Sequence, residues 1–156
     1  MRSAPLPAGA AGIFLAIANA EDEVLSQTDY AKFSEPFDKI VLAGVSSSAP
    51  LNVLHLHGDK VYLDRFYKGW PVAGTPNFSS HDTGIDFAKV RPSYSGILMG
   101  GIDERNYRTL NAEELKRQST AAAKEAGNRF ILAPGCSVPD ESTNSELQKL
   151  PQFLNI

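Results

Sequence analysis

Two histidines and a cysteine are the side chains of this sequence best suited to chemistry. His55 and His57 are separated by one residue within an apolar segment, and Cys136 is the only cysteine of the chain. Because side chains alternate between the two faces of a strand, both imidazoles are expected on one face. Two imidazoles and one thiolate could bind Zn²⁺ and leave its fourth position open. Such a site is a Lewis acid that can bind and deprotonate a thiol or a water.

A structural role is the alternative for each of these residues. His55 and His57 could be two hydrogen-bonded histidines of the core, and a single buried cysteine usually behaves as a small apolar side chain. The spacing alone leaves both interpretations open.

Four other polar residues are candidates for binding a substrate: Asn77, His81, Asp82 and Asp103. His81 and Asp82 could form a hydrogen-bonded pair that orients a ligand, although a polar loop often contains such residues without a function. Asp103 follows a glycine pair that would let a ligand approach the backbone, and it could equally cap the turn that comes next.

The elements that must position these residues alternate along the chain. Five segments read as strands: 13–18, 51–57, 70–74 (weakly), 97–102 and 129–133. Helix-like segments or long loops separate them, which favours a parallel sheet in an α/β fold. The candidate residues mostly follow strands, and ligands bind at the carboxyl ends of parallel strands. No glycine-rich phosphate loop follows any strand, so a dinucleotide or P-loop function is not expected.

The helix signals are local. Ser26 and Asp29 form a capping box that opens a helix, and Pro36 predicts a kink or break within it. Apolar residues at helical spacing give this helix one apolar face: Tyr30, Phe33, Phe37, Ile40, Val41 and Val45. Further helices are predicted near 61–67, from Asn111 to Gly127, and from 144 onward, with a long polar loop over 76–84.

The composition limits the class of protein. The chain has 156 residues, a formal net charge of −3, 42% hydrophobic residues and one cysteine. These values exclude a disulfide-stapled mini-protein and a wholly disordered chain. They give no reason to expect nucleic acid or a membrane as a partner, because the chain is slightly acidic and has no apolar run of about 18 residues.

The N-terminal segment has two interpretations. Residues 10–18 are apolar, and Ala18-Asn19-Ala20 resembles the cleavage site of a secretory signal. We favour a buried strand preceded by a flexible leader over 1–11, since one lone arginine and two prolines make a poor signal start. A cytoplasmic protein is then expected.

Four motifs occur in an order that resembles the uroporphyrinogen decarboxylase superfamily. They are Gly12-Ile13-Phe14 with the helix after it, Asn52 to Gly58, Gly100-Gly101-Ile102-Asp103, and Phe130 to Pro139. The resemblance covers nearly the whole chain and follows the second half of the family's sequence. It implies the C-terminal half of a (β/α)8 TIM-type barrel, with about five parallel strands and helices, as one partial domain over 1–156.

The resemblance implies one of two activities. Decarboxylases of the family remove carboxyl groups from uroporphyrinogen in porphyrin biosynthesis, without a cofactor, and are lyases. Methyltransferase-like members move a methyl group between a corrinoid and a thiol, with zinc held by a His-x-Cys pair and a late Cys. By position, His55, His57 and Cys136 match the three metal ligands. We therefore expect a zinc-dependent methyltransferase, with a small thiol or a tetrapyrrole as ligand and a corrinoid protein as a partner.

Departures from the family's pattern keep other outcomes open. His57 stands where the methyltransferases usually have Cys, whereas decarboxylases have His at the position of Cys136 and lack the histidine pair. Gly101 and Glu104 replace the Asn and Pro of the usual Gly-Asn-x-Asp-Pro turn, and Ala16 lies near a usual Ser or Thr. The family's first barrel half, which carries the decarboxylase's substrate-binding arginine and aspartate, has no counterpart here. The chain could thus be an inactive half that needs a separate N-terminal half-barrel or forms a homodimer.

Overall fold

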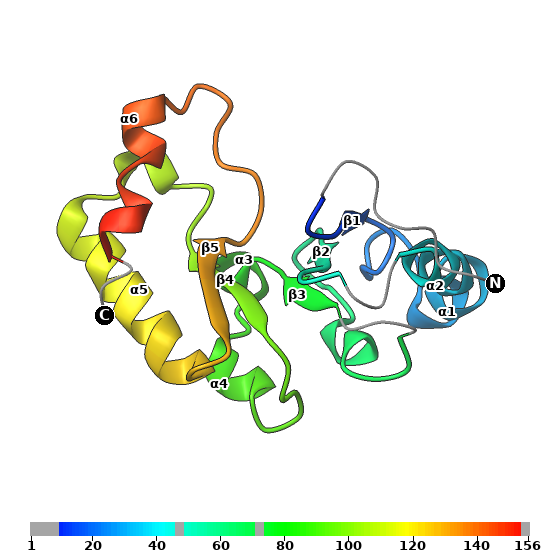
Figure 1. The fold of residues 1–156 in the computed structure, drawn as a ribbon. Helices are drawn as coiled ribbons and strands as arrows, with labels where there is room; N and C mark the ends of the chain where they lie inside the picture. The colour runs from blue at the N-terminus through cyan, green and yellow to red at the C-terminus, as the bar shows by residue number, and fades with distance from the viewer. Residues whose placement is uncertain (1–9, 46–48, 71–73, 154–156) are drawn as a thin grey trace. The chain divides into compact units, whose positions relative to one another are not determined.

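The computed structural model describes residues 10–45, 49–70 and 74–153. Its chain divides into two compact units, Met1–Asn77 and Phe78–Ile156, which are called unit 1 and unit 2. Each unit has its own parallel strands and its own helices (Figure 1). Most of the predicted leader, residues 1–9, lies outside the described part, but the carbonyl of Ala11 accepts a hydrogen bond from the amide of Leu51 at 3.1 Å.

Unit 1 contains three parallel strands. β2 (Val53–Leu56) pairs with β1 (Phe14–Ile17) on one side and with β3 (Thr75–Asn77) on the other (Figure 1). All four residues of β2 are buried, which explains its nearly continuous apolar sequence. The predicted strands over 13–18 and 51–57 are confirmed, and the register places His55 beside Ala16 and Asn77.

The prediction of the third strand was wrong in its position. The expected segment 70–74 is not a strand at Trp70 or Gly74, and residues 71–73 lie outside the described part. The strand is β3, which falls within the predicted polar loop. Its proline cannot donate to a ladder, so the sequence Thr75-Pro76-Asn77 does not read as a strand. Pairing with β2 outweighs this local preference, and the amide of Thr75 donates to the carbonyl of Asn52 at 2.7 Å.

Two short helices follow β1. α1 (Gln27–Phe33) begins at Ser26, whose hydroxyl accepts a hydrogen bond from the amide of Asp29, as predicted. α2 (Glu35–Ala43) begins directly after Ser34 with Pro36 in its first turn, so the predicted break is confirmed. A 3₁₀ helix, η2 (Leu63–Phe66), occupies the predicted helical segment after β2.

The apolar face predicted for this helical segment is only partly buried. Tyr30 and Val45 are buried, but the other four apolar side chains are more than half exposed: Phe33, Phe37, Ile40 and Val41. The break at Ser34 ends the helical period of α1, so one face does not run through both helices.

Unit 2 contains β4 (Leu98–Ile102) and β5 (Phe130–Pro134), which pair in parallel as predicted. The long helix α5 (Ala112–Ala126) packs along both strands (Figure 1). Asn111 caps its start and Gly127 ends it with a φ of 69°, which confirms both predicted boundaries. Ile102, Tyr107 and Leu115 form the buried cluster between helix and strands.

Shorter helices complete unit 2. Two of them were not predicted: α3 (Ser80–Thr83) lies in the predicted polar loop, and α4 (Phe87–Val90) lies in a segment without a helix signal. The others are α6 (Asn144–Leu147), which is close to its predicted start, and the 3₁₀ helices η3 (Tyr107–Thr109) and η4 (Leu150–Phe153). Packing stabilises α4 where the sequence has no helix signal, because the ring of Phe87 packs edge-on against the rings of Phe78 and Phe130.

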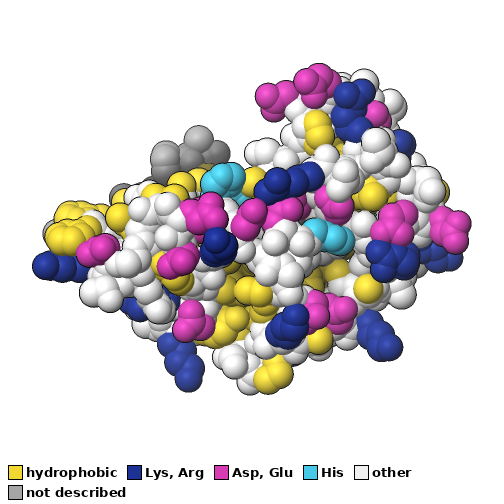
Figure 2. Space-filling model, turned by 180° about the vertical axis from the view of Figure 1, so that it is seen from behind, with side chains coloured by type: hydrophobic (Ala, Val, Ile, Leu, Met, Phe, Trp, Pro, Cys, Tyr) yellow, Lys and Arg dark blue, Asp and Glu magenta, His cyan; other side chains and the backbone are white. Residues whose placement is uncertain are grey.

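Among the described residues, no helix has both the length and the apolar content needed to cross a bilayer. Figure 2 shows acidic and basic side chains mixed over the face in view, in keeping with the small net charge of −3.

Candidate functional site

His55 lies in the centre of the unit 1 sheet. Its side chain is buried, and its Nδ1 lies 2.7 Å from Oδ1 of Asn77 on the neighbouring strand β3. An amide oxygen can only accept a hydrogen bond, so Nδ1 is the donor, and in the neutral imidazole Nε2 then carries the lone pair. This is the form of imidazole that binds a metal ion, and a partner on the other ring nitrogen is typical of metal-binding histidines.

His57 follows the last residue of β2 and is exposed. Its backbone amide donates to the carbonyl of Ile17 at 3.1 Å, and its ring centroid lies 6.1 Å from that of His55. The ring of Phe14 stacks on His55 with centroids 5.4 Å apart. The structure thus brings both histidines and Asn77 to the carboxyl ends of the unit 1 strands, where the sequence predicted them.

Cys136 belongs to unit 2, forms no disulfide within the described part of the chain, and carries a half-buried thiol two residues after β5. The preceding Gly135 is buried and tightly packed, because a Cβ there would lie 2.4 Å from Cα of Ser79. The amide of Gly135 donates to two acceptors, the carbonyl of Ile102 at 3.3 Å and Oε2 of Glu104 at 3.2 Å. The backbone that presents the thiol is therefore fixed.

His81 and Asp82 lie in α3 and have separate surroundings. His81 is exposed and lines a cavity of about 190 Å³ together with residues of α5. Asp82 forms an ion pair with Arg105, with Oδ2 2.6 Å from Nε. The surroundings of both side chains come from unit 2. Their role in binding a substrate stays a prediction.

Asp103 has the capping role that was one of its two predicted alternatives. Its carboxylate accepts hydrogen bonds from the backbone amide of Asn106 at 3.0 Å and from the Asn106 side chain at 2.9 Å. The glycine pair before it serves packing as well, because Gly101 has a φ of 97° and a Cβ there would lie 2.5 Å from the Cβ of Ala122. Gly101 lets α5 approach β4 closely.

Glu104 is a residue of this region that the sequence analysis did not select. Its side chain is 2% exposed, and Oε1 has no hydrogen-bond partner within the described part of the chain. A buried carboxylate is unusual and marks a position with a specific role. The only signal in the sequence is that a glutamate stands where the resembling family usually has proline, and this does not predict burial.

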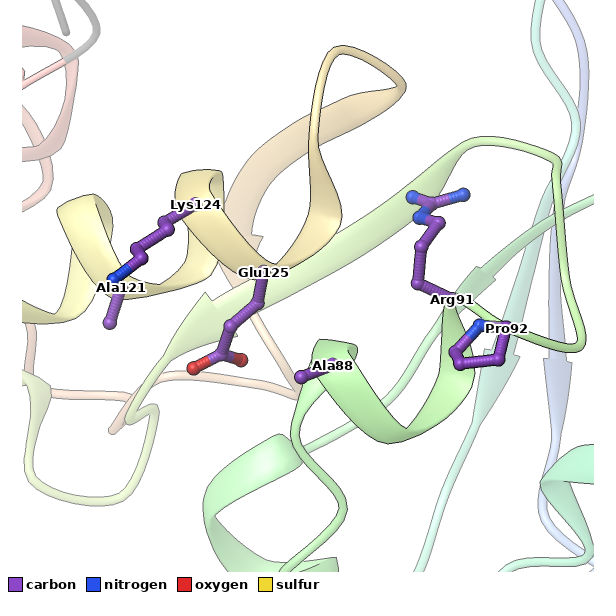
Figure 3. Close-up of a pocket in the computed structure, with 6 residues that line it drawn as sticks. All are labelled: Ala88, Arg91, Pro92, Ala121, Lys124 and Glu125. Carbon is purple, nitrogen blue, oxygen red and sulfur yellow. The ribbon is translucent and has the colours of Figure 1, made fainter.

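A larger pocket than the one beside His81 lies elsewhere in unit 2. It has about 650 Å³ and is lined by residues of and near α4 and α5: Ala88, Arg91, Pro92, Ala121, Lys124 and Glu125. The guanidinium of Arg91 already donates to three carbonyls, and Glu125 accepts the amide of Phe87. In Figure 3 the charged ends of Arg91 and Glu125 point in different directions. No histidine or cysteine lines this pocket, so the candidate chemistry stays at the strand ends.

A family model described as Uroporphyrinogen decarboxylase (URO-D) matches residues 3–155. No curated protein sequence matches the chain. A solved structure, a methyltransferase from Methanosarcina mazei, matches with a TM-score of 0.74 and 17% identity, over 93% of this chain and 42% of that one. The chain thus spans less than half of that structure, and it has the predicted fold class, five parallel strands with helices as part of a barrel.

Proposed function

Because the chain belongs to the uroporphyrinogen decarboxylase family, we propose that it supplies the metal-binding part of a zinc-dependent methyltransferase. In this proposal His55, His57 and Cys136 hold Zn²⁺, and the reaction moves a methyl group between a corrinoid and a thiol. The observation that carries the proposal is the hydrogen bond between His55 and Asn77, which sets the imidazole tautomer for metal binding.

The donor set fits zinc. Two neutral imidazoles and a thiolate are ligands that Zn²⁺ prefers, and three protein ligands leave a position for a substrate. Zn²⁺ bound there would supply a Lewis acid that lowers the pKa of a substrate thiol. Asn77 holds the proton on Nδ1 of His55, and Phe14 covers one face of that ring.

The path of the chain supports the inclusion of Cys136. Asn77 is the last residue of β3, and Phe78 and Ser79 follow it directly. Within unit 2, the backbone of these two residues packs against Gly135, the neighbour of Cys136. The thiol therefore belongs to a turn packed on the segment that continues from the partner of His55.

The methyl transfer itself needs a co-substrate. The thiol would release its proton to water and its sulfur would form a bond to the methyl carbon, while the bond between that carbon and the corrinoid would break and leave its electron pair on the corrinoid. This chain spans 42% of the solved methyltransferase. A further barrel segment, whether in the same chain, a separate half or a second copy, is therefore part of the proposal.

Metal analysis with single substitutions tests the proposal. We expect the purified protein to bind zinc in an equimolar amount, and His55→Ala, His57→Ala and Cys136→Ala each to weaken binding at least about tenfold. His81→Ala is the matched control, since this third histidine lies in α3 of unit 2 and should leave zinc binding unchanged. With Co²⁺ in place of zinc, the sulfur-to-metal charge-transfer band should vanish in Cys136→Ala alone. Unchanged zinc content in His57→Ala would overturn the proposal.

Decarboxylation is the second candidate, and the description of the matching family favours it. In that case the same strand ends would form part of a tetrapyrrole pocket and need no metal. Tight binding of a carboxylated porphyrin, unaffected by a zinc chelator, would support this alternative. Binding that depends on Cys136 and zinc would exclude it.

A further inference from the structure

Glu104 has two carboxylate oxygens in different situations. Oε2 accepts the amide of Gly135, whereas Oε1 has no partner among the described residues. The side chain is 2% exposed, so water compensates little of the cost of burying a carboxylate. A neutral apolar side chain would avoid this cost. Among residues 10–45, 49–70 and 74–153, the only hydrogen-bond partner of the Glu104 side chain is the amide of Gly135.

That contact acts on the turn that carries the thiol. The amide of Gly135 is shared between the carbonyl of Ile102 and Glu104, at 3.3 and 3.2 Å. The peptide between Pro134 and Gly135, directly before Cys136, is therefore held by Ile102 of β4 and by Glu104.

We propose that Glu104 is a positioning residue that fixes the Gly135–Cys136 turn and thereby sets the metal affinity and the reactivity of the Cys136 thiol. The proposal rests on the proposed metal site, and it adds a residue outside the ligand set. In this proposal, Glu104 fixes the turn by accepting the hydrogen bond from the Gly135 amide, and its negative charge contributes less to this than the hydrogen bond does.

Two substitutions separate these properties. Glu104→Gln keeps an oxygen that can accept the Gly135 amide but removes the charge. Glu104→Met keeps the approximate volume and removes the acceptor. We expect Glu104→Met to weaken zinc binding about tenfold or more relative to Glu104→Gln, as measured by competition with a chromophoric chelator. Glu104→Gln should bind zinc within about threefold of the unmodified protein.

A second readout does not depend on the metal. Cys136 is the only cysteine, so the rate of alkylation of the metal-free protein by iodoacetamide reports on this thiol alone. A loosened turn exposes the half-buried thiol more often, so Glu104→Met should react at least about threefold faster than Glu104→Gln. If the unmodified protein binds no zinc, the proposed function fails, and the alkylation rates still test the role of Glu104.

Three outcomes would overturn the inference. Equal alkylation rates in Glu104→Met and Glu104→Gln would show that the acceptor does not hold the turn. Equal weakening of zinc binding in both would make the charge the important property. If Glu104→Met does not fold, Glu104→Asp replaces it, since a shorter carboxylate keeps the charge but withdraws from Gly135. If Cys136 in Glu104→Asp is then alkylated as slowly as in the unmodified protein, the proposal is contradicted.

Discussion

Units 1 and 2 stabilise their functional regions by different means. Unit 1 joins polar side chains to one another, as in the pair of His55 with Asn77 and the hydrogen bond from Tyr30 to Asp38 at 3.0 Å. In unit 2, the candidate ligand Cys136 follows Gly135, whose backbone lies so close to that of Phe78 and Ser79 that no Cβ would fit. A side-chain pair tolerates a substitute of similar hydrogen-bonding capacity, whereas a crowded backbone tolerates no added atom.

The largest expected effect is on the crowded backbone of unit 2. In Gly135→Ala the new methyl group would lie 2.4 Å from Cα of Ser79 and 2.7 Å from the carbonyl oxygen of Phe78. Neither backbone atom can move without shifting its segment, so we expect a loss of about 3 kcal/mol in the free energy of unfolding, measured in urea. Gly84→Ala is the control: it has open space around it and bears only the strain of a φ of 64°, about 1 kcal/mol. Equal losses in both variants would contradict the role of crowding.

The pair of His55 and Asn77 in unit 1 should be sensitive to the hydrogen-bonding capacity of a substituted side chain and not to its volume. Asn77→Ala leaves Nδ1 of the buried His55 without its partner, which should cost about 2 kcal/mol in the free energy of unfolding. It should also weaken zinc binding about tenfold, because the tautomer of His55 is no longer fixed. Asn77→Asp keeps an acceptor at this position and should retain most of the affinity. Chelator competition measures both, and an unchanged affinity in Asn77→Ala would remove Asn77 from the site.

This difference also explains what the sequence could predict. The strand with His55 is a short, nearly continuous apolar run, so the sequence located it correctly, whereas the role of His55 and His57 as metal ligands stays a prediction. β3 is short and contains Pro76, and only its pairing with β2 makes it a strand, so local signals placed it too early. Glu104 could not be found at all, because its burial depends on the packing of β4 against β5 across a long stretch of sequence.

The smallest effects are expected at ion pairs, where the two units again differ. In unit 1, Glu35 of α2 is buried and pairs with Lys39 at 2.5 Å and with Arg65 of η2. Burial opposes ionisation of Glu35, but the hydrogen bonds from Lys39 and Arg65 outweigh it and lower the pKa of this carboxyl below its usual value of 4.5. In unit 2, Glu114 pairs with Arg117 at the surface of α5.

A lowered pKa in the folded state ties stability to pH in one direction. The stabilisation by Glu35 is fully present above pH 4.5 and is lost as the pH falls through the lower pKa of the folded state. Glu35→Gln should therefore reduce the free energy of unfolding by about 1 kcal/mol at pH 7 and flatten its decline below pH 4.5, as followed by urea denaturation. Glu114→Gln is the matched control in an exposed pair, where hydrogen bonds from Arg117 and Gln118 lower the pKa to about 2 but solvent screens the interaction. Its unfolding midpoint at pH 7 should not change, and a loss as large as that of Glu35→Gln would show that burial does not distinguish the two units.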